Sequence, residues 1–413
     1  MLKILYVLSM AVAFSMEVNT VSLPYFLKYE IAIAWIIISV IKSGWIIKRE
    51  DFNTIKIFAL PIIVAFFYTL IIWFVNPPEY LKFKYLSRLI SNLGCMLVIV
   101  VCIIMVCRLF GKNAIKLSFW ALFLTIGFNF IIVLQEYGFS SMTIYLRNVF
   151  SMEQFSYGSI ISNISYALEV HDATFAMGIF LIYFIFYYES ERKDKLIYIL
   201  CSLVGSYLGF KRNALIAILV SAILALSFIR KKSHNFIKTC QILGFGMFIV
   251  GMLYVALIKN IDVLPSFVKI LDVARINLYH FLSGEYSISP FYFGKGYSYI
   301  NNRLGLETGL LHTSHTDLVR IYIEMGIYGF ALWIWYYFVK LPRELYTKYS
   351  EIAAKFFLIV TFYVFSTYFL DNTLTLFDNQ FIYYLIPLAM CKQDTELNSM
   401  FQEPEKISRR DNE

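Results

Sequence analysis

The chain has 413 residues, of which 59% are hydrophobic and only 15% charged, and its formal net charge is +8. Soluble globular domains carry about 25% charged residues, so this composition, with a mean hydropathy of +0.67, excludes an ordinary soluble domain and indicates a polytopic membrane protein. Because Lys and Arg collect in the cytoplasmic loops of such proteins, the positive charge is interpreted as topology and not as affinity for nucleic acid.

Apolar segments follow one another along the chain. A membrane-spanning helix needs roughly 20 mostly apolar residues, so the sequence predicts an all-α protein with about twelve transmembrane helices in one transmembrane domain, residues 1–391. The predicted spans lie at about 2–16, 29–47, 55–75, 89–106, 117–134, 173–188, 196–210, 214–229, 239–258, 317–339 and 352–370, and a last one ends near 391. The first run resembles a signal peptide without a small-residue cleavage site, so we expect an uncleaved helix.

The loops between the spans predict the orientation. With the N-terminus inside, every break that falls inside is rich in Lys and Arg, in agreement with the positive-inside rule; these breaks are 48–56, 107–116, 189–195, 230–238 and 340–351. The long loops 135–171 and 259–316 and the short polar break 371–379 then fall outside. The loop 259–316 comes just before the tenth helix. The charged tail 392–413 is expected to be cytoplasmic and disordered.

Two external breaks carry cations against this trend. One contains Lys82, Lys84 and Arg88, and the other contains Lys211 and Arg212. Charged groups near membrane depth are costly and usually line a polar cavity. Both breaks are therefore candidate functional sites.

A polar segment opens the tenth predicted span, and it contains the first candidate for catalysis. The polar residues there are His312, Ser314, His315, Asp317 and Arg320. His315 exchanges a proton near neutral pH, as a general base must, and His312 and Asp317 are candidate substrate-binding or orienting neighbours. The alternative interpretation is a solvated loop histidine that hydrogen-bonds locally.

Metal and cofactor chemistry are not indicated. His312 and His315 could instead form a metal pair, but no third strong ligand is spaced beside them. The chain has no P-loop, Rossmann or HExxH motif, and its six cysteines lie in or beside apolar runs. We therefore expect no metal and no cofactor, and an energy source that is built into the substrate or supplied from elsewhere.

Several cations are candidates for binding an anionic substrate. Arginine holds phosphate with a planar pair of donors, and Arg212, preceded by Lys211, opens a predicted helix whose N-terminus also favours an anion. Arg275 and Arg303 lie in the long external loop, and Arg320 lies one turn into the tenth span. The structural alternatives are a cation that snorkels to lipid headgroups for Arg212, a helix-face charge for Arg275, and an i,i+4 pair with Glu324 for Arg320.

Two glycine pairs are interpreted as structural. Gly294-x-Gly296 is predicted to form a tight turn and not a phosphate cradle. Gly326-x-x-Gly329 is predicted to let another helix approach closely, which would fix the angle of the helix that bears His315.

Three segments together resemble a known family. HTDLVRIYIEMGIYG (315–329) resembles the histidine and GxxG pattern of O-antigen ligases and O-antigen polymerases. GFKRNALIA (209–217) resembles their arginine-containing helix start, and ARINLYHF…SPFYFGKGYSYI (274–300) resembles their run of arginine, proline and GxG. The chain departs from the family at Thr316, where Asn, Ser or Gln is usual, and at Lys211, where Ser is common. The resemblance covers about 206–337.

The resemblance implies a multi-pass, GT-C-like glycosyltransferase of the bacterial inner membrane with its active site facing the periplasm. Such enzymes move a glycan from undecaprenyl diphosphate to an acceptor without a metal or a nucleotide sugar. Carried over to this chain, Arg212 and Arg275 bind the diphosphate, and His315 acts on the acceptor hydroxyl. A flippase and a chain-length regulator are implied partners.

The acceptor distinguishes the two activities in the family. In a polymerase it is another lipid-linked repeat unit of O-antigen or capsule, and in a ligase it is lipid A-core or a protein. The high aromatic content, the absence of a large extra domain and the loop size favour the polymerase. A flippase for lipid-linked polysaccharide is the competing class, but it should carry its charges within the spans and show repeat symmetry.

Overall fold

The computed structural model describes residues 1–15, 24, 26–46, 48–75, 83–148, 164, 173–208, 212–229, 235–261, 273–307 and 315–407. Within these ranges the chain is helical and contains no strand. The helices are α1 (Leu2–Ser15), α2 (Leu27–Lys42), α3 (Arg49–Val75), α4 (Phe83–Phe110), α5 (Asn113–Asn148), α7 (Ala173–Phe186), α8 (Arg192–Leu208), α9 (Arg212–Ile229), α10 (Phe236–Lys259), α12 (Val273–Gly284), α13 (Tyr299–Glu307), α14 (Asp317–Trp335), η3 (Tyr336–Lys340), α15 (Leu341–Lys348), α16 (Glu351–Thr367), η4 (Thr373–Thr375) and α17 (Phe377–Ile407).

The helical membrane protein predicted from hydropathy is confirmed, because each predicted apolar segment lies on a helix. Among the described residues, five helical stretches are long and apolar enough to cross a membrane: Arg49–Val75, Tyr85–Phe110, Asn113–Ile144, Phe236–Lys259 and Asp317–Lys348. Three further apolar helices, within α1, α7 and α9, are shorter. The count of about twelve spans stays a prediction.

Burial separates central helices from lipid-facing ones. Every residue from Ala173 to Phe184 on α7 is buried, and most of α16 is buried as well. On α9 and α10, by contrast, Ile216, Phe245 and Leu253 are 63%, 69% and 66% exposed. Apolar surface of this kind is unfavourable in water, so these faces pack against lipid tails.

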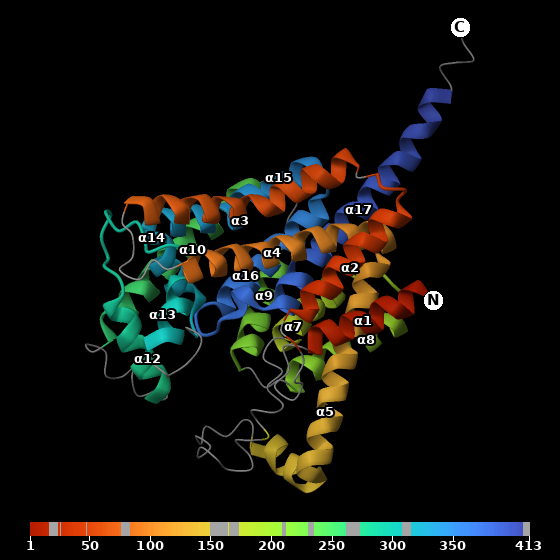
Figure 1. Cartoon of the computed structure of the whole chain (residues 1–413). Helices are drawn as coiled ribbons and strands as arrows, with labels where there is room; N and C mark the ends of the chain where they lie inside the picture. Colours follow the sequence, from red (N-terminus) through yellow and green to blue (C-terminus); the bar gives the residue numbers. More distant parts are fainter. Residues whose placement is uncertain are drawn as a thin grey trace.

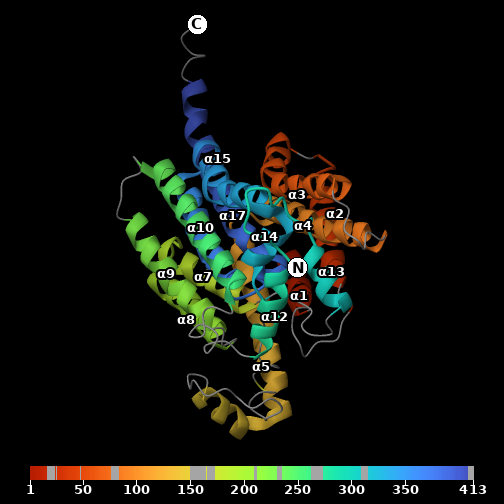
Figure 2. The same cartoon turned by 90° about the vertical axis from the view of Figure 1, so that its left-hand side faces the viewer.

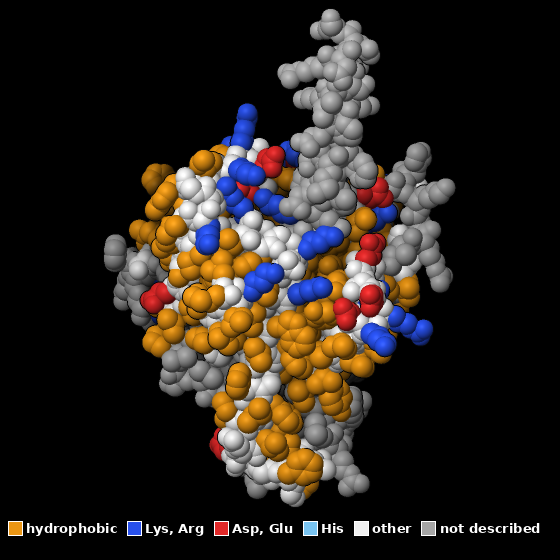
Figure 3. All heavy atoms as spheres, turned by 90° about the vertical axis from the view of Figure 1, so that its right-hand side faces the viewer, with side chains coloured by type: hydrophobic (Ala, Val, Ile, Leu, Met, Phe, Trp, Pro, Cys, Tyr) orange, Lys and Arg blue, Asp and Glu red, His pale blue; other side chains and the backbone are white. Residues whose placement is uncertain are grey.

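The two ends of the helix bundle differ in character. Figure 1 shows the N-terminus and the projecting end of α17 at one end, and α12 and α13 at the other. Figure 3 shows Lys and Arg side chains gathered on the face that carries both termini. α12 and α13, the described helices of the long loop before α14, therefore lie at the end opposite the termini.

Two helices run past the ends predicted for them. α5 continues beyond the predicted span, with a kink at Gly138 (φ 77°), as far as Asn148. α17 does not end at Cys391 but continues as a helix to Ile407. Lys392 attaches α17 to α3 at the point where α17 leaves the bundle, because its Nζ lies 2.6 Å from Asp51 Oδ1.

α14 is the element that positions the candidate site, and it lies between α10 and α3 (Figure 2). It is broken at Gly326, where φ is 65°. Gly326 is thus a break in the helix, and not only the helix–helix contact predicted from the GxxG spacing.

The break in α14 is filled by the loop 292–296. The N–H groups of Lys295 and Gly296 donate to the carbonyls of Ile323 and Glu324, at 3.0 and 2.8 Å, and the N–H of Ile327 donates to the carbonyl of Tyr292 at 3.1 Å. We call this joint the glycine clasp. The Gly294-x-Gly296 turn uses its amides to bind α14, which fits a structural turn and not a phosphate cradle.

Candidate functional site

The N-terminus of α14 begins at a strained residue. His315 has φ 44°, in the left-handed region that few residues other than glycine adopt, and its side chain is half-buried. Thr316 then returns to an extended conformation and begins the helix. Such strain persists where surrounding contacts impose it, and it is often found at functional sites.

The contacts that impose this geometry come from the turn 368–371, which follows α16. The N–H groups of Asp317 and Leu318 donate to the carbonyls of Asp371 and Tyr368, both at 3.2 Å. In return the N–H of Leu374 donates to Asp317 Oδ2 at 2.6 Å. Because its first amides are occupied, α14 has little to offer an anion, and any anion bound here must be held by side chains.

The same turn contacts the start of α9. Asn213 Nδ2 donates to Asp371 Oδ2 at 3.3 Å, and α9 begins one residue earlier, at Arg212. The backbone of Arg212 is therefore adjacent to the turn that caps α14. The side chain of Arg212, and all of Lys211 and His312, lie outside the described residues.

α12 reaches the turn through two tyrosines. Tyr254 on α10 donates its hydroxyl to the carbonyl of Phe369 at 2.6 Å, and it lies 3.4 Å from the hydroxyl of Tyr279 on α12. Arg275 is four residues before Tyr279, about one helical turn away. Its side chain also lies outside the described residues, but its helix is placed.

α12 is fixed on α10 at its far end. Lys259 Nζ donates to the carbonyls of Ser283 and Tyr286, both at 2.6 Å, and the Tyr286 hydroxyl donates to the carbonyl of Val255 at 2.7 Å. The structure thus brings the segments of the three catalytic candidates, Arg212, Arg275 and His315, to one turn.

Asp317 and Arg320 serve the protein's own packing. Asp317 Oδ1 lies 2.8 Å from Arg320 Nη2, and both side chains are almost fully buried. The pair predicted between Arg320 and Glu324 is replaced by this one, and Glu324 Oε1 instead accepts from the N–H of Ile300 at 3.1 Å. A buried charge needs such a partner, so these contacts favour a structural role for Asp317 and Arg320.

Arg303 belongs to a second ionic cluster, which joins α12, the glycine clasp and α13. Its Nε lies 3.5 Å from Glu285 Oε1, while Lys295 Nζ and the Tyr299 hydroxyl lie 2.6 and 2.9 Å from Glu285 Oε2. Burial acts to raise the pKa of Glu285, but Lys295, Tyr299 and Arg303 together outweigh it and lower that pKa below its ordinary value.

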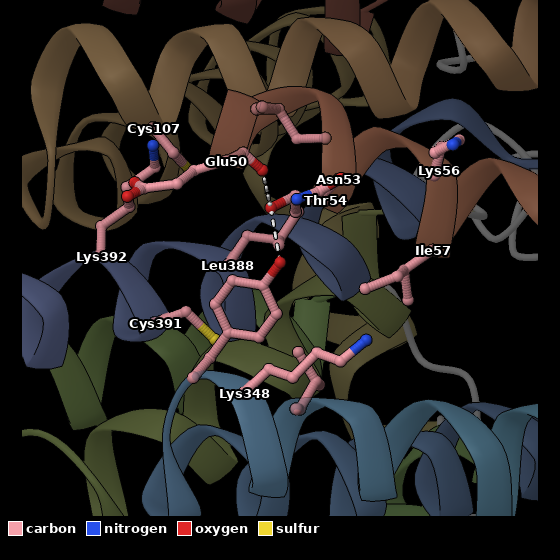
Figure 4. Close-up of a pocket in the computed structure, with 13 residues that line it drawn as sticks. Glu50, Asn53, Thr54, Lys56, Ile57, Cys107, Lys348, Leu388, Cys391 and Lys392 are labelled. Carbon is pink, nitrogen blue, oxygen red and sulfur yellow. Dashed lines mark hydrogen bonds between the residues drawn. The ribbon is translucent and has the colours of Figure 1, made fainter. Parts of the chain in front are cut away.

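A cavity of about 500 Å³ lies at the opposite end of the bundle, between α3, α4, α15 and α17 (Figure 4). Thr54 lies at its wall, with its hydroxyl 2.9 Å from the carbonyl of Glu50 and 3.1 Å from the Tyr349 hydroxyl. Two of its lysines are engaged: Lys392 with Asp51, and Lys348 with Glu344. Two of the cavity's cations thus form ion pairs within the protein, and the pair of Lys392 with Asp51 attaches α17 to α3. These contacts favour a structural role for the cavity.

Sequence reasoning missed the residues that connect the site. Asp371, Asn213 and Tyr254 join three helices that are distant in sequence. The one available signal was the polar break 371–379 between the last two predicted spans. Its partners could not be read from the sequence because the contacts are non-local.

The described residues contain no group of three or more His, Cys, Asp or Glu side chains arranged to hold a metal ion. Of His312 and His315, for which the sequence disfavours a metal pair, the structure describes His315 alone, and its side chain is half-buried. Comparison of the chain with protein-family models, curated proteins and solved structures finds no match.

Proposed function

We propose that this membrane protein is a metal-independent glycosyltransferase that uses a polyprenyl-diphosphate-linked glycan as donor and a lipid-linked repeat unit as acceptor. In this proposal it polymerises surface polysaccharide, O-antigen or capsule, at the outer face of the bacterial inner membrane. A flippase would deliver its substrates, and a chain-length regulator would act beside it.

One observation carries the proposal: the 368–371 turn gathers the start of α9, the strained His315 and the α12–α10 pair. These are the segments that carry the two arginines and the histidine of the resembled families. They are far apart in sequence, and nothing in the hydropathy pattern requires them to meet.

The chemistry follows from these residue types. The bond between the anomeric carbon and the diphosphate oxygen breaks, and a bond from that carbon to the acceptor oxygen forms. Arg212 and Arg275 stabilise the charge that develops on the departing diphosphate, and His315 takes the proton of the acceptor hydroxyl. The bond energy of the donor drives the transfer, so no nucleotide site is required.

The test is a surface-glycan gel of a deletion strain complemented with wild type, Arg212→Ala or His315→Asn. Asparagine is chosen because it tolerates the left-handed conformation of His315 but does not act as a base. We expect both variants to lose long-chain product at least a hundredfold, with wild-type abundance in the membrane. Lys238→Ala on α10, in a break predicted to lie on the opposite face, is the matched control and should leave product unchanged.

The intermediates identify the class of activity. Core carrying a single repeat unit identifies a polymerase, whereas long chains that stay on the lipid carrier identify a ligase. Normal glycan in the deletion strain, or intermediates trapped on the cytoplasmic face, would contradict the glycosyltransferase and favour a transporter. Equal loss of product and of protein in His315→Asn would show that His315 is structural.

A further inference from the structure

A polar cavity of about 310 Å³ lies beside α4, close to the 368–371 turn but lined by other residues. Its lining comes from α2, α4, α13 and the η4 segment, and includes Arg88, Asn92, Asn301, Asn302 and Thr375. Arg88 lies in one of the two breaks whose cations the positive-inside pattern does not explain. The structure now places it at the wall of a cavity, where such cations are expected.

Some polar atoms that line this cavity form no hydrogen bond with the described part of the protein. Arg88 Nη1 donates to Asn302 Oδ1 at 2.6 Å, and no carboxylate of the described residues forms an ion pair with Arg88. Asn302 is 2% exposed, yet its Nδ2 has no hydrogen-bond partner in the described part of the chain. An unpaired buried donor costs about 1–3 kcal/mol. A guanidinium and an amide donor together fit the oxygens of a phosphate.

The polar cavity adjoins an apolar groove of about 380 Å³, because Met96 and Tyr297 line both. The groove lies between α3, α4, α14 and η3. Its outer edges include Leu60, Val64 and Leu332, which are 43%, 37% and 47% exposed. The groove is therefore open sideways to the bilayer.

The groove also follows most of a membrane-spanning stretch. It is lined along α14 and η3 from Ile321 to Lys340, within the stretch Asp317–Lys348 that is long and apolar enough to cross a membrane. The hydrocarbon core of a membrane is about 30 Å thick. A chain lying in the groove would cross most of that thickness, with its head at the level of Arg88.

We propose that the cavity and the groove form one binding site for a lipid with a phosphate headgroup. Arg88 and Asn302 hold the phosphate, and the face of α14 that carries Leu332 and Trp335 packs along the chain. The proposal rests on contacts separate from those at His315, and it stands or fails independently of the glycosyltransferase proposal.

The test is binding of undecaprenyl phosphate to the full-length protein in nanodiscs, measured by native mass spectrometry. Undecaprenol, the same lipid without its phosphate, shows how much the phosphate contributes to binding. Inorganic phosphate, added as a competitor, shows how much the polyprenyl chain contributes. We expect Arg88→Gln to weaken binding of undecaprenyl phosphate at least tenfold and to leave binding of undecaprenol unchanged. We expect Val64→Trp, which fills the groove from α3, to weaken binding of both lipids at least tenfold.

Matched controls lie on exposed positions that do not line either space. Arg343→Gln on α15 and Ile71→Trp on α3 should each bind within twofold of wild type. Wild-type affinity in both Arg88→Gln and Val64→Trp overturns the proposal. So does equal binding of undecaprenol by the wild type, or displacement of the lipid by equimolar inorganic phosphate. Because the two variants lie on different helices, failure of one to fold leaves the other to decide.

Discussion

Single residues at the start of α14 divide into those that fix the helix and His315, which we propose to act on a substrate. Asp317 and Arg320 neutralise each other inside α14, and Asp317 also accepts the N–H of Leu374. His315, two residues before Asp317, is half-buried and strained. The burial of the ion pair keeps the end of α14 in place, so the histidine is presented from a fixed point.

Breaking the buried ion pair is therefore expected to destabilise the protein. Asp317→Asn removes the carboxylate that lies 2.8 Å from the buried Arg320 guanidinium, and breaking a buried pair in this way costs about 3–5 kcal/mol. Thermal unfolding in detergent should show a large fall in Tm for this variant, and a partial recovery when Arg320→Gln is added. Lys355→Gln on α16, which removes a partly exposed pair with Glu351, should cost below about 1 kcal/mol. An unchanged Tm in Asp317→Asn would contradict the structural role.

The cluster around Glu285 predicts a pH dependence. Its folded-state pKa lies below the ordinary value, so the ionised carboxylate stabilises the fold at neutral pH, and this contribution is lost as pH falls through the folded pKa. We expect Glu285→Gln to lower Tm at pH 7. The difference between wild type and variant should shrink progressively below about pH 4.3, the unfolded value. A difference that does not change with pH would show that the effect is steric.

At the scale of elements, the glycine clasp determines the shape of α14. A Cβ on Gly294 would lie 2.5 Å from both the carbonyl oxygen of Glu324 and the nitrogen of Gly326. Tyr68 and Trp73 on α3 hold the same loop, donating to the carbonyls of Phe293 and Lys295 at 2.9 and 3.0 Å. The clasp thus ties α3 and the loop to the break in α14.

Gly294→Ala tests the clasp. The residue has φ 90°, so alanine there is strained by about 1–3 kcal/mol, and the clash with α14 adds to that cost. We expect a marked fall in Tm, because α14 is displaced. The same displacement should reduce the long-chain glycan seen in the surface-glycan gel. Gly246→Ala on α10, whose added Cβ meets nothing within 4 Å, is the control and should not lower Tm. Normal stability of Gly294→Ala would show that the loop can leave the helix at little cost.

Sequence reasoning predicted the helices well and the joints between them poorly. The hydropathy pattern located the helices because a backbone in lipid must satisfy its hydrogen bonds within the helix. The break at Gly326 was missed because it depends on the loop 292–296, which fills it. The contact of Arg88 with Asn302 joins residues 214 positions apart, and a single sequence contains no signal for such a pair. Arg88 itself was found only because it violates a charge rule.

At the scale of the whole molecule, the two ends of the bundle should face different compartments. Ser287 and Thr347 are exposed. Ser287 closely follows α12 and Thr347 lies on α15, and α15, unlike α12, lies near the end of the bundle from which α17 projects (Figure 1). In a background with Cys95→Ser and Cys201→Ser, a membrane-impermeant maleimide should label Ser287→Cys in intact cells. Thr347→Cys should be labelled only after permeabilisation. The reverse pattern would invert the predicted orientation, and equal labelling of both would show that they share a face.

The glycine clasp also reduces the conformational entropy that the long connection between α10 and α14 can lose or gain as a single loop. The entropy lost on closing a flexible loop increases with its length, and the clasp divides this connection into two shorter loops. The half that carries Arg275 is fixed on α10 by Lys259 and Tyr286, so the entropy lost on closing it does not depend on the length of the half that leads to α14.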